Sequence, residues 1–152
     1  TSRRQRQMCI RDSFDILREA GLEVDLVSVN GAAQVTGTNG LVIDGCVPLE
    51  GYDFSATSAL VVPGGSGYAP IEASEKATEQ IRAFGNNPDK VLGAICAGAS
   101  IPGKLGLYKG KKYTVVPGMD GDFGGFFEKN LVTRICGENV AKKLRRQTFW
   151  EI

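Results

Sequence analysis

The chain has 152 residues, of which 42% are hydrophobic and 23% are charged, a composition typical of one globular domain with its own core. The formal net charge is +1, so bulk electrostatics predict no nucleic-acid or membrane partner, and no apolar run approaches the roughly 20 residues of a membrane helix. The chain contains no histidine, which excludes Ser-His and Cys-His catalysis within it and any histidine-ligated metal.

The four cysteines are scattered along the chain without a CxxC spacing, at Cys9, Cys46, Cys96 and Cys136. Such scatter favours free thiols in a reducing compartment over a disulfide framework. We therefore expect a cytoplasmic protein.

Residues 1–13 are basic and polar, show neither helical nor strand periodicity, and lack the apolar core of a signal peptide. One interpretation is a disordered basic arm. The other is that the segment is not native coding sequence, because residues 8–13 match one reading frame of a sequencing-library transposon end. The chain would then be a metagenomic fragment with a single domain over residues 14–152.

The first elements of that domain follow from periodicity and turn residues. Residues 14–21 place apolar side chains at helical spacing and end in Gly21, which predicts a helix. Residues 22–30 alternate between apolar and polar, as in a strand. Residues 31–53 are rich in glycine and turn pairs, so we expect loops and short extended pieces around residues 41–44.

The middle of the chain contains the strongest signals. Residues 59–65 begin with a continuous apolar run, which is typical of a strand buried on both faces of a parallel sheet. Residues 74–85 predict a helix with Ser74 as its N-cap and Gly85 at its end. Residues 91–95 form a second apolar run and predict a second buried strand.

A short helix is expected after Cys96, followed by strands over residues 111–118 and 130–133, and the tail from Glu138 could form a helix. Strands separated by helical segments predict an α/β fold with a parallel sheet covered on both faces. There are no internal repeats and no clear domain boundary.

Two glycine-rich turns should meet at one edge of this sheet. The loops that follow parallel strands gather along one edge, where ligands bind, so Gly64 and Gly65 could adjoin Cys96. A cysteine between a strand and a helix, flanked by small residues, has the pattern of a nucleophile elbow. Helix dipoles favour a thiolate there, and the N–H groups of Gly64, Gly65 and Ala97 could stabilise an oxyanion.

Simpler interpretations stay open for both turns. A free cysteine is among the most buried residue types, so Cys96 could be a small buried thiol. Gly64 and Gly65 alone would suit an ordinary turn at the end of a strand.

Four stretches of residues 14–133 resemble the ThiJ/PfpI family in order and spacing: LREAGLEVDLVSV, ALVVPGGSGY, VLGAICAGAS and GKLGLYKGKKYTVVPG. This superfamily includes the parkinsonism-associated protein deglycase and intracellular protease I. The resemblance implies a flavodoxin-like three-layer sandwich with a mostly parallel sheet, related to class I glutamine amidotransferases. It also implies a homodimer without a cofactor.

The resemblance places the family's cysteine at Cys96 and its oxyanion-hole glycines at Gly64 and Gly65. It implies glyoxalase or deglycase chemistry on a small dicarbonyl or glycated substrate. The alternative is a non-catalytic redox sensor or a chaperone-like module on the same fold. A glutamine amidotransferase is disfavoured, because that chemistry needs a histidine.

The chain also departs from the family pattern. The family's acidic residue falls at Cys9, and its histidine falls at Val116. Pro102 stands inside the expected short helix, where it would cost about 3 kcal/mol. The family's first strand has no counterpart, and the sequence diverges after residue 133. From these departures we expect a sheet that lacks its first strand and a chain that is weakly active or inactive.

Overall fold

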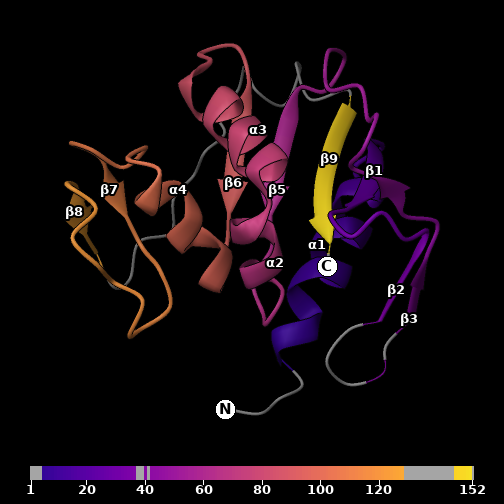
Figure 1. Cartoon of the computed structure of the whole chain (residues 1–152), viewed down its shortest axis with the longest axis horizontal. Coiled ribbons are helices and arrows are strands. Elements are labelled where there is room, and N and C mark those ends of the chain that lie inside the picture. The colour runs from indigo at the N-terminus through magenta and orange to yellow at the C-terminus, as the bar shows by residue number, and fades with distance from the viewer. Residues whose placement is uncertain (1–4, 37–39, 41, 129–145, 152) are drawn as a thin grey trace.

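The computed structural model describes residues 5–36, 40, 42–128 and 146–151. Their helices and strands form a sheet with helices on both sides and two small strand pairs at the periphery (Figure 1). None of the helices in these ranges is long and apolar enough to cross a membrane.

The central sheet has five strands in the order β4-β1-β9-β5-β6. Their bounds are Val47–Pro48 for β4, Glu23–Ser28 for β1, Arg146–Glu151 for β9, Ala59–Val62 for β5 and Val91–Ala94 for β6. Every pairing within this sheet is parallel, so the predicted parallel α/β sheet is confirmed.

The strand β9 lies in the middle of the sheet, between β1 and β5 (Figure 1). Phe149 is in register with Leu26 of β1 and with Val61 of β5. The expectation of a helix in the tail is therefore wrong for residues 146–151, which include Thr148, Phe149 and Trp150, residue types that favour strands. The sheet was expected to lack its first strand; in the described residues the position between β1 and β5 is occupied by β9.

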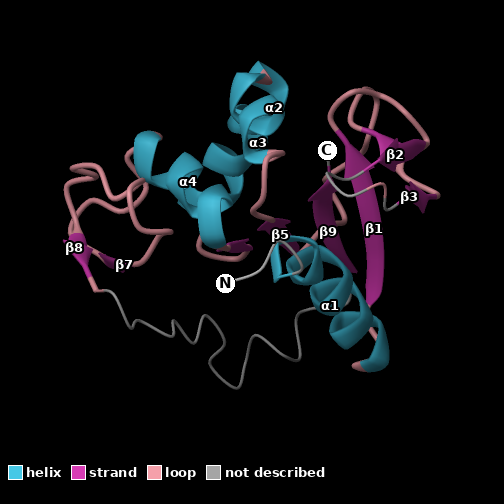
Figure 2. Cartoon of the chain, turned by 90° about the horizontal axis from the view of Figure 1, so that it is seen from below, coloured by secondary structure: helices cyan, strands magenta, loops and turns pink. Residues whose placement is uncertain are grey.

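Helices cover both faces of the sheet (Figure 2). The helix α1, Gln5–Glu19, lies on one face. The other face carries α2, Tyr68–Ala73, α3, Glu75–Asn86, and α4, Ser100–Lys104. This arrangement is the expected three-layer sandwich.

The helix α1 is longer than the sequence pattern predicts. The expected helix starts at Phe14, whereas α1 starts at Gln5, so residues 5–13 belong to a regular element. Whether these residues are native coding sequence stays a prediction. At the other end α1 stops at Glu19, and Gly21 follows with a φ of +78°, as the predicted glycine stop requires.

The helix α3 begins where the sequence predicts. The hydroxyl of Ser74 accepts a hydrogen bond from the N–H of Ala77 at 3.2 Å, which is N-capping geometry. Ile81 and Phe84 are buried on its inner face. Gly85 does not end the helix, which runs to Asn86.

Gly85 is needed for a different reason. A Cβ atom at this position would lie 2.5 Å from a methyl group of Leu107. Gly85 therefore allows Leu107 to pack closely against α3.

The peripheral strands form two pairs. The strands β2, Gln34–Thr36, and β3, Val42–Asp44, are antiparallel, and β7, Lys112–Tyr113, pairs in parallel with β8, Phe126–Phe127. The strand predicted over residues 111–118 is thus only two residues long. The strand predicted over residues 130–133 lies outside the described residues.

Two apolar clusters hold these layers together. The main core lies mostly between the sheet and the helices α2, α3 and α4, and it contains Val27, Leu49, Phe54, Leu60, Val62, Ile71, Ala77, Ile81, Phe84 and Ile101. Burial of each large side chain contributes about 1.5–3 kcal/mol.

The second cluster consists of Ala99, Tyr113 and Val115, with Ala94, Tyr108, Val116, Met119 and Phe123 packed against it. It fixes the segment around Tyr113 against the turn that follows β6.

Candidate active site

Cys96 stands at a sharp change of backbone direction after β6. Ile95 is still extended, with φ of −135° and ψ of 148°, and Cys96 then has a φ of +56°. Among the described residues it is the only non-glycine residue with a positive φ. Side chains with a Cβ atom avoid this region, and such strain often accompanies functional sites. The predicted elbow at Cys96 therefore has the backbone that a nucleophile elbow needs.

The turn at Gly64 lies directly against this elbow. A Cβ atom on Gly64 would be 2.5 Å from the Cβ atom of Cys96 and 3.2 Å from the nitrogen of Ala97. Likewise, a Cβ atom on Gly98 would lie 2.2 Å from the carbonyl oxygen of Pro63. Glycine at both positions lets the two turns touch, as the topology predicts.

Cys96 is partly exposed, whereas Cys46 is buried with 4% of its surface accessible. The interpretation of Cys96 as a buried core thiol therefore does not hold. A partly exposed sulfur can meet a solute, which a nucleophile must do.

The three residues whose backbone amides are predicted as oxyanion donors lie in the two turns that meet at this elbow. Gly65 has a φ of +93°, Gly64 packs against Cys96 and against the nitrogen of Ala97, and Ala97 directly follows the cysteine. Within the described part of the chain, the N–H groups of Gly64, Gly65 and Ala97 donate to no protein acceptor. Their donor capacity is thus available to a ligand, although their role stays a prediction.

The helical segment after Cys96 is too short to develop a full helix dipole. It consists of a 3₁₀ turn, η1, over Cys96–Ala99, followed by the five-residue α4. Because only aligned peptide units add to the dipole, these short pieces stabilise a thiolate less than a long helix would.

Pro102 costs less in this helix than the sequence suggests. It lies in the first turn of α4, where backbone N–H groups have no partner within that helix. The expected cost of about 3 kcal/mol applies to helix interiors. Buried Pro102 is therefore compatible with the fold.

The positions of the family's acid and histidine supply no base. Cys9 falls inside α1, and its side chain lies outside the described part of the structure. Val116 packs against the second cluster, beside Tyr113 and Val115, and an alkyl side chain cannot move a proton. The predicted site around Cys96 therefore has neither group at these two positions.

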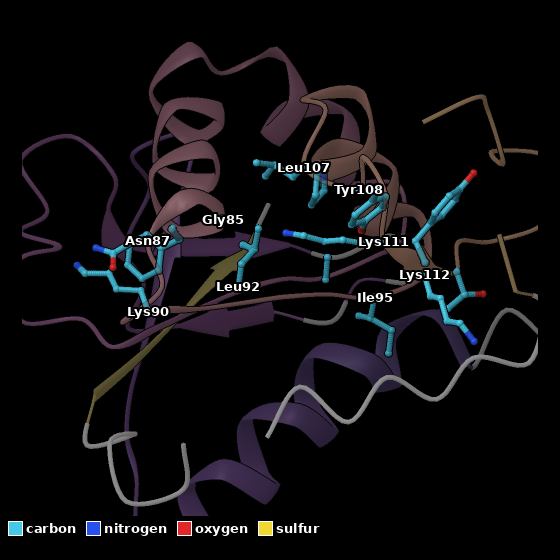
Figure 3. A pocket seen from close by; sticks show the side chains of 14 residues that line it. Gly85, Asn87, Lys90, Leu92, Ile95, Leu107, Tyr108, Lys111 and Lys112 are labelled. Atoms are coloured by element: carbon cyan, nitrogen blue, oxygen red, sulfur yellow. The ribbon is translucent and has the colours of Figure 1, made fainter. Parts of the chain in front are cut away.

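A cavity of about 490 Å³ opens beside the elbow (Figure 3). Ala94 and Ile95 line it, but Cys96 does not. Its other walls come from the end of α3, the segment 87–92 and residues 102–114. Sequence reasoning missed this cavity because no motif marks the convergence of these segments.

Tyr108 and Tyr113 form the aromatic wall of this cavity, with ring centroids 5.0 Å apart in a stacked arrangement. The hydroxyl of Tyr108 donates to the carbonyl of Ala99 at 2.8 Å. Burial, and secondarily the nearby Tyr113, raise the pKa of Tyr108 to about 12. Tyr108 is therefore a neutral hydrogen-bond donor at physiological pH.

The fold and the site together define the class of this protein. It is a parallel α/β sandwich with a strained cysteine turn that packs against a diglycine turn. The model of the DJ-1/PfpI family matches residues 7–142. The chain belongs to this family, which confirms the resemblance seen in the sequence.

Individual relatives agree with this assignment. A deglycase of Pyrococcus abyssi is 30% identical over 106 residues, which are 70% of this chain and 63% of the relative. The protein YraA of Bacillus subtilis, named as a candidate cysteine protease, is 31% identical over 96 residues, 63% of this chain and 56% of YraA. The chain thus spans less than two thirds of the length of either relative.

The solved structure of DJ-1beta from Drosophila melanogaster has the same fold. Its TM-score is 0.72 at 23% identity, over 91% of this chain and 80% of the fly protein. The flavodoxin-like architecture is therefore established.

Proposed function

We propose that Cys96 is the nucleophile of a cofactor-free enzyme that acts on small dicarbonyl compounds or on their adducts with amino groups. The observation that carries this proposal is the strained backbone of Cys96, held directly against Gly64. The match to a deglycase of Pyrococcus abyssi supports the same reaction class.

The chemistry balances without an external oxidant. The Cys96 thiolate adds to the aldehyde carbon of methylglyoxal, and the resulting oxyanion accepts hydrogen bonds from the amides of the site before it takes a proton. Transfer of hydrogen from the former aldehyde carbon to the ketone carbon oxidises the first and reduces the second, which leaves a lactoyl thioester. Water then cleaves the carbon–sulfur bond and yields lactate and the free thiol.

This reaction should be slow in the present chain. General acid–base catalysis typically contributes about 10²–10⁴-fold, and neither Val116 nor the residue type at Cys9 supplies a normal base. We therefore propose that this chain is a weak enzyme, slower than family members that have both groups.

The experiment measures lactate formation from methylglyoxal by the wild-type chain and by Cys96→Ala. The control is Cys46→Ala, because Cys46 is buried and lies outside the elbow. We expect turnover to disappear in Cys96→Ala and to persist in Cys46→Ala. Equal turnover by wild type and Cys96→Ala would discard the enzyme proposal.

A second candidate function is redox sensing by the same sulfur. The observation that favours it is the valine at position 116, where the family has a histidine. The partly exposed thiol of Cys96 therefore has no general base from this position. Such thiols react with peroxide to give sulfenic and then sulfinic acid. Mass spectrometry after peroxide treatment should find more oxidation at Cys96 than at Cys46, and equal oxidation at both would remove this candidate.

We further propose that the protein is a cytoplasmic homodimer, as the family resemblance implies. The molar mass in solution, measured by light scattering, tests the dimer. A monomer at micromolar concentration would overturn it.

A further inference from the structure

The cavity beside the elbow has a mainly apolar lining. Leu92 and Ile95 lie on one side, and Leu107 and Tyr108 lie on the other (Figure 3). The ring of Tyr113, which also lines the cavity, stacks on the ring of Tyr108. Its volume of about 490 Å³ lies within the roughly 300–1,000 Å³ of pockets that hold small ligands. Size and lining therefore suit a small molecule with an apolar body.

The charged residues that line this cavity are all lysines. Lys90 donates to the carbonyl of Phe54 at 3.0 Å and stands 4.5 Å from the ring centroid of Phe84. Lys112 forms an ion pair with Glu128 at 2.6 Å. Both of these ammonium groups already have partners.

Lys111 differs from the other two lysines. In the described part of the chain its ammonium group has no hydrogen-bond or ion-pair partner. Figure 3 shows its side chain running between Leu107 and Tyr108 on one side and Leu92 and Ile95 on the other. Among the described residues, Lys111 is therefore the lining lysine whose ammonium group has neither a hydrogen-bond nor an ion-pair partner, and it stands beside apolar walls.

We propose that this cavity binds a small organic monocarboxylate whose apolar body packs on Tyr108 and Leu92 while its carboxylate pairs with Lys111. One available ammonium group matches one negative charge, whereas a phosphate dianion would call for further donors. An apolar body removes the leucine and tyrosine surfaces from water. Because Cys96 does not line the cavity, this binding does not depend on the proposed reaction.

The test uses 3-phenylpropionate as the probe and isothermal titration calorimetry as the readout. Its neutral partner is 3-phenylpropan-1-ol, which has the same ring and chain length. We expect the wild-type chain to bind the acid about tenfold more tightly than the alcohol, a difference of about 1.4 kcal/mol. Cys96→Ala should bind the acid as wild type does, so that failure of the proposed reaction leaves this test intact.

Two lysine variants locate the charge. Lys111→Met should weaken acid binding about tenfold and leave alcohol binding unchanged. Lys109→Met is the matched control, because Lys109 is also exposed but does not line the cavity, and it should bind the acid as wild type does. Lys111→Glu should reverse the preference and favour 3-phenylpropylamine over the acid.

The proposal is overturned if wild type does not bind the acid, or if it binds acid and alcohol equally. It is also overturned if Lys111→Met and Lys109→Met weaken binding alike. Tighter binding of phenyl phosphate than of the carboxylate would overturn the assignment of a monoanion.

Discussion

Gly64 packs so closely against Cys96 that position 64 has no room for a side chain. A Cβ atom on Gly64 would lie 2.5 Å from the Cβ atom of Cys96, and the carbonyl oxygen of Ile95 would be only 3.0 Å away. Two of the three nearest atoms are backbone atoms, so the neighbours cannot simply rotate aside. The absence of a side chain at Gly64 is therefore a condition for the elbow to exist.

Gly64→Ala should destabilise the fold and disturb the elbow. Overpacking of this kind costs about 1–3 kcal/mol, so the free energy of unfolding in urea should fall by that amount. Gly93→Ala is the control, because its Cβ atom would meet Val61 at 3.5 Å, an ordinary contact. If Gly64→Ala unfolds at the same urea concentration as Gly93→Ala, the close packing of the two turns is wrong.

Cys96→Gly should be more stable than Cys96→Ala. A residue with a Cβ atom pays about 1–2 kcal/mol in the left-handed region that Cys96 occupies, and glycine does not. We expect a difference of about 1 kcal/mol in the free energy of unfolding, measured by urea titration. At Ala97, where φ is not positive, substitution by glycine should instead destabilise by about 0.5–1 kcal/mol. A less stable Cys96→Gly would contradict the strained backbone.

Ionisation of Tyr108 should destabilise the fold at high pH. The folded-state pKa of Tyr108 is raised from 10.0 to about 12, first by burial and then by Tyr113. Below pH 10 both states hold the proton, and between pH 10 and about 12 only the folded state does, so stability falls with rising pH in this window. The absorbance of tyrosinate, followed against pH for wild type and Tyr108→Phe, should differ by one group that titrates near pH 12. A difference titrating near pH 10 would contradict the burial of this hydroxyl.

Ser74→Ala should remove the N-cap of α3. The lost hydrogen bond to the N–H of Ala77 should lower the free energy of unfolding by about 1 kcal/mol, which thermal unfolding can detect. Thr78→Ala is the matched control, because its hydroxyl donates to the carbonyl of Glu75 on an exposed surface. Alanine has the higher helix propensity, so Thr78→Ala should be neutral or slightly stabilising. Equal losses in the two variants would argue against a capping role for Ser74.

The elements that the sequence predicts well are those with local causes. The apolar run at residues 59–62 predicts β5, and Ser74 predicts the start of α3. The elbow at Cys96 follows from small residues after an apolar strand, and parallel topology brings Gly64 to it. Each of these features depends on neighbouring residues or on one general rule of sheets.

The elements that the sequence misses depend on distant contacts. The strand β9 pairs with β1 and β5, whose residues are more than 80 positions away along the chain, so local periodicity does not reveal it. Gly85 resembles a helix stop, but Leu107 packs against it. The cavity at Lys111 unites segments from α3 to Thr114, which no single motif connects.

The insertion of β9 between β1 and β5 has a kinetic consequence. During synthesis on the ribosome, β1 and β5 leave the exit tunnel long before residues 146–151 are made, and the gap between them cannot close until that stretch arrives. Pairings between residues so far apart along the chain slow folding. Once β6 has emerged, β4-β1 and β5-β6 therefore remain separate pairs with unpaired strand edges until residues 146–151 arrive.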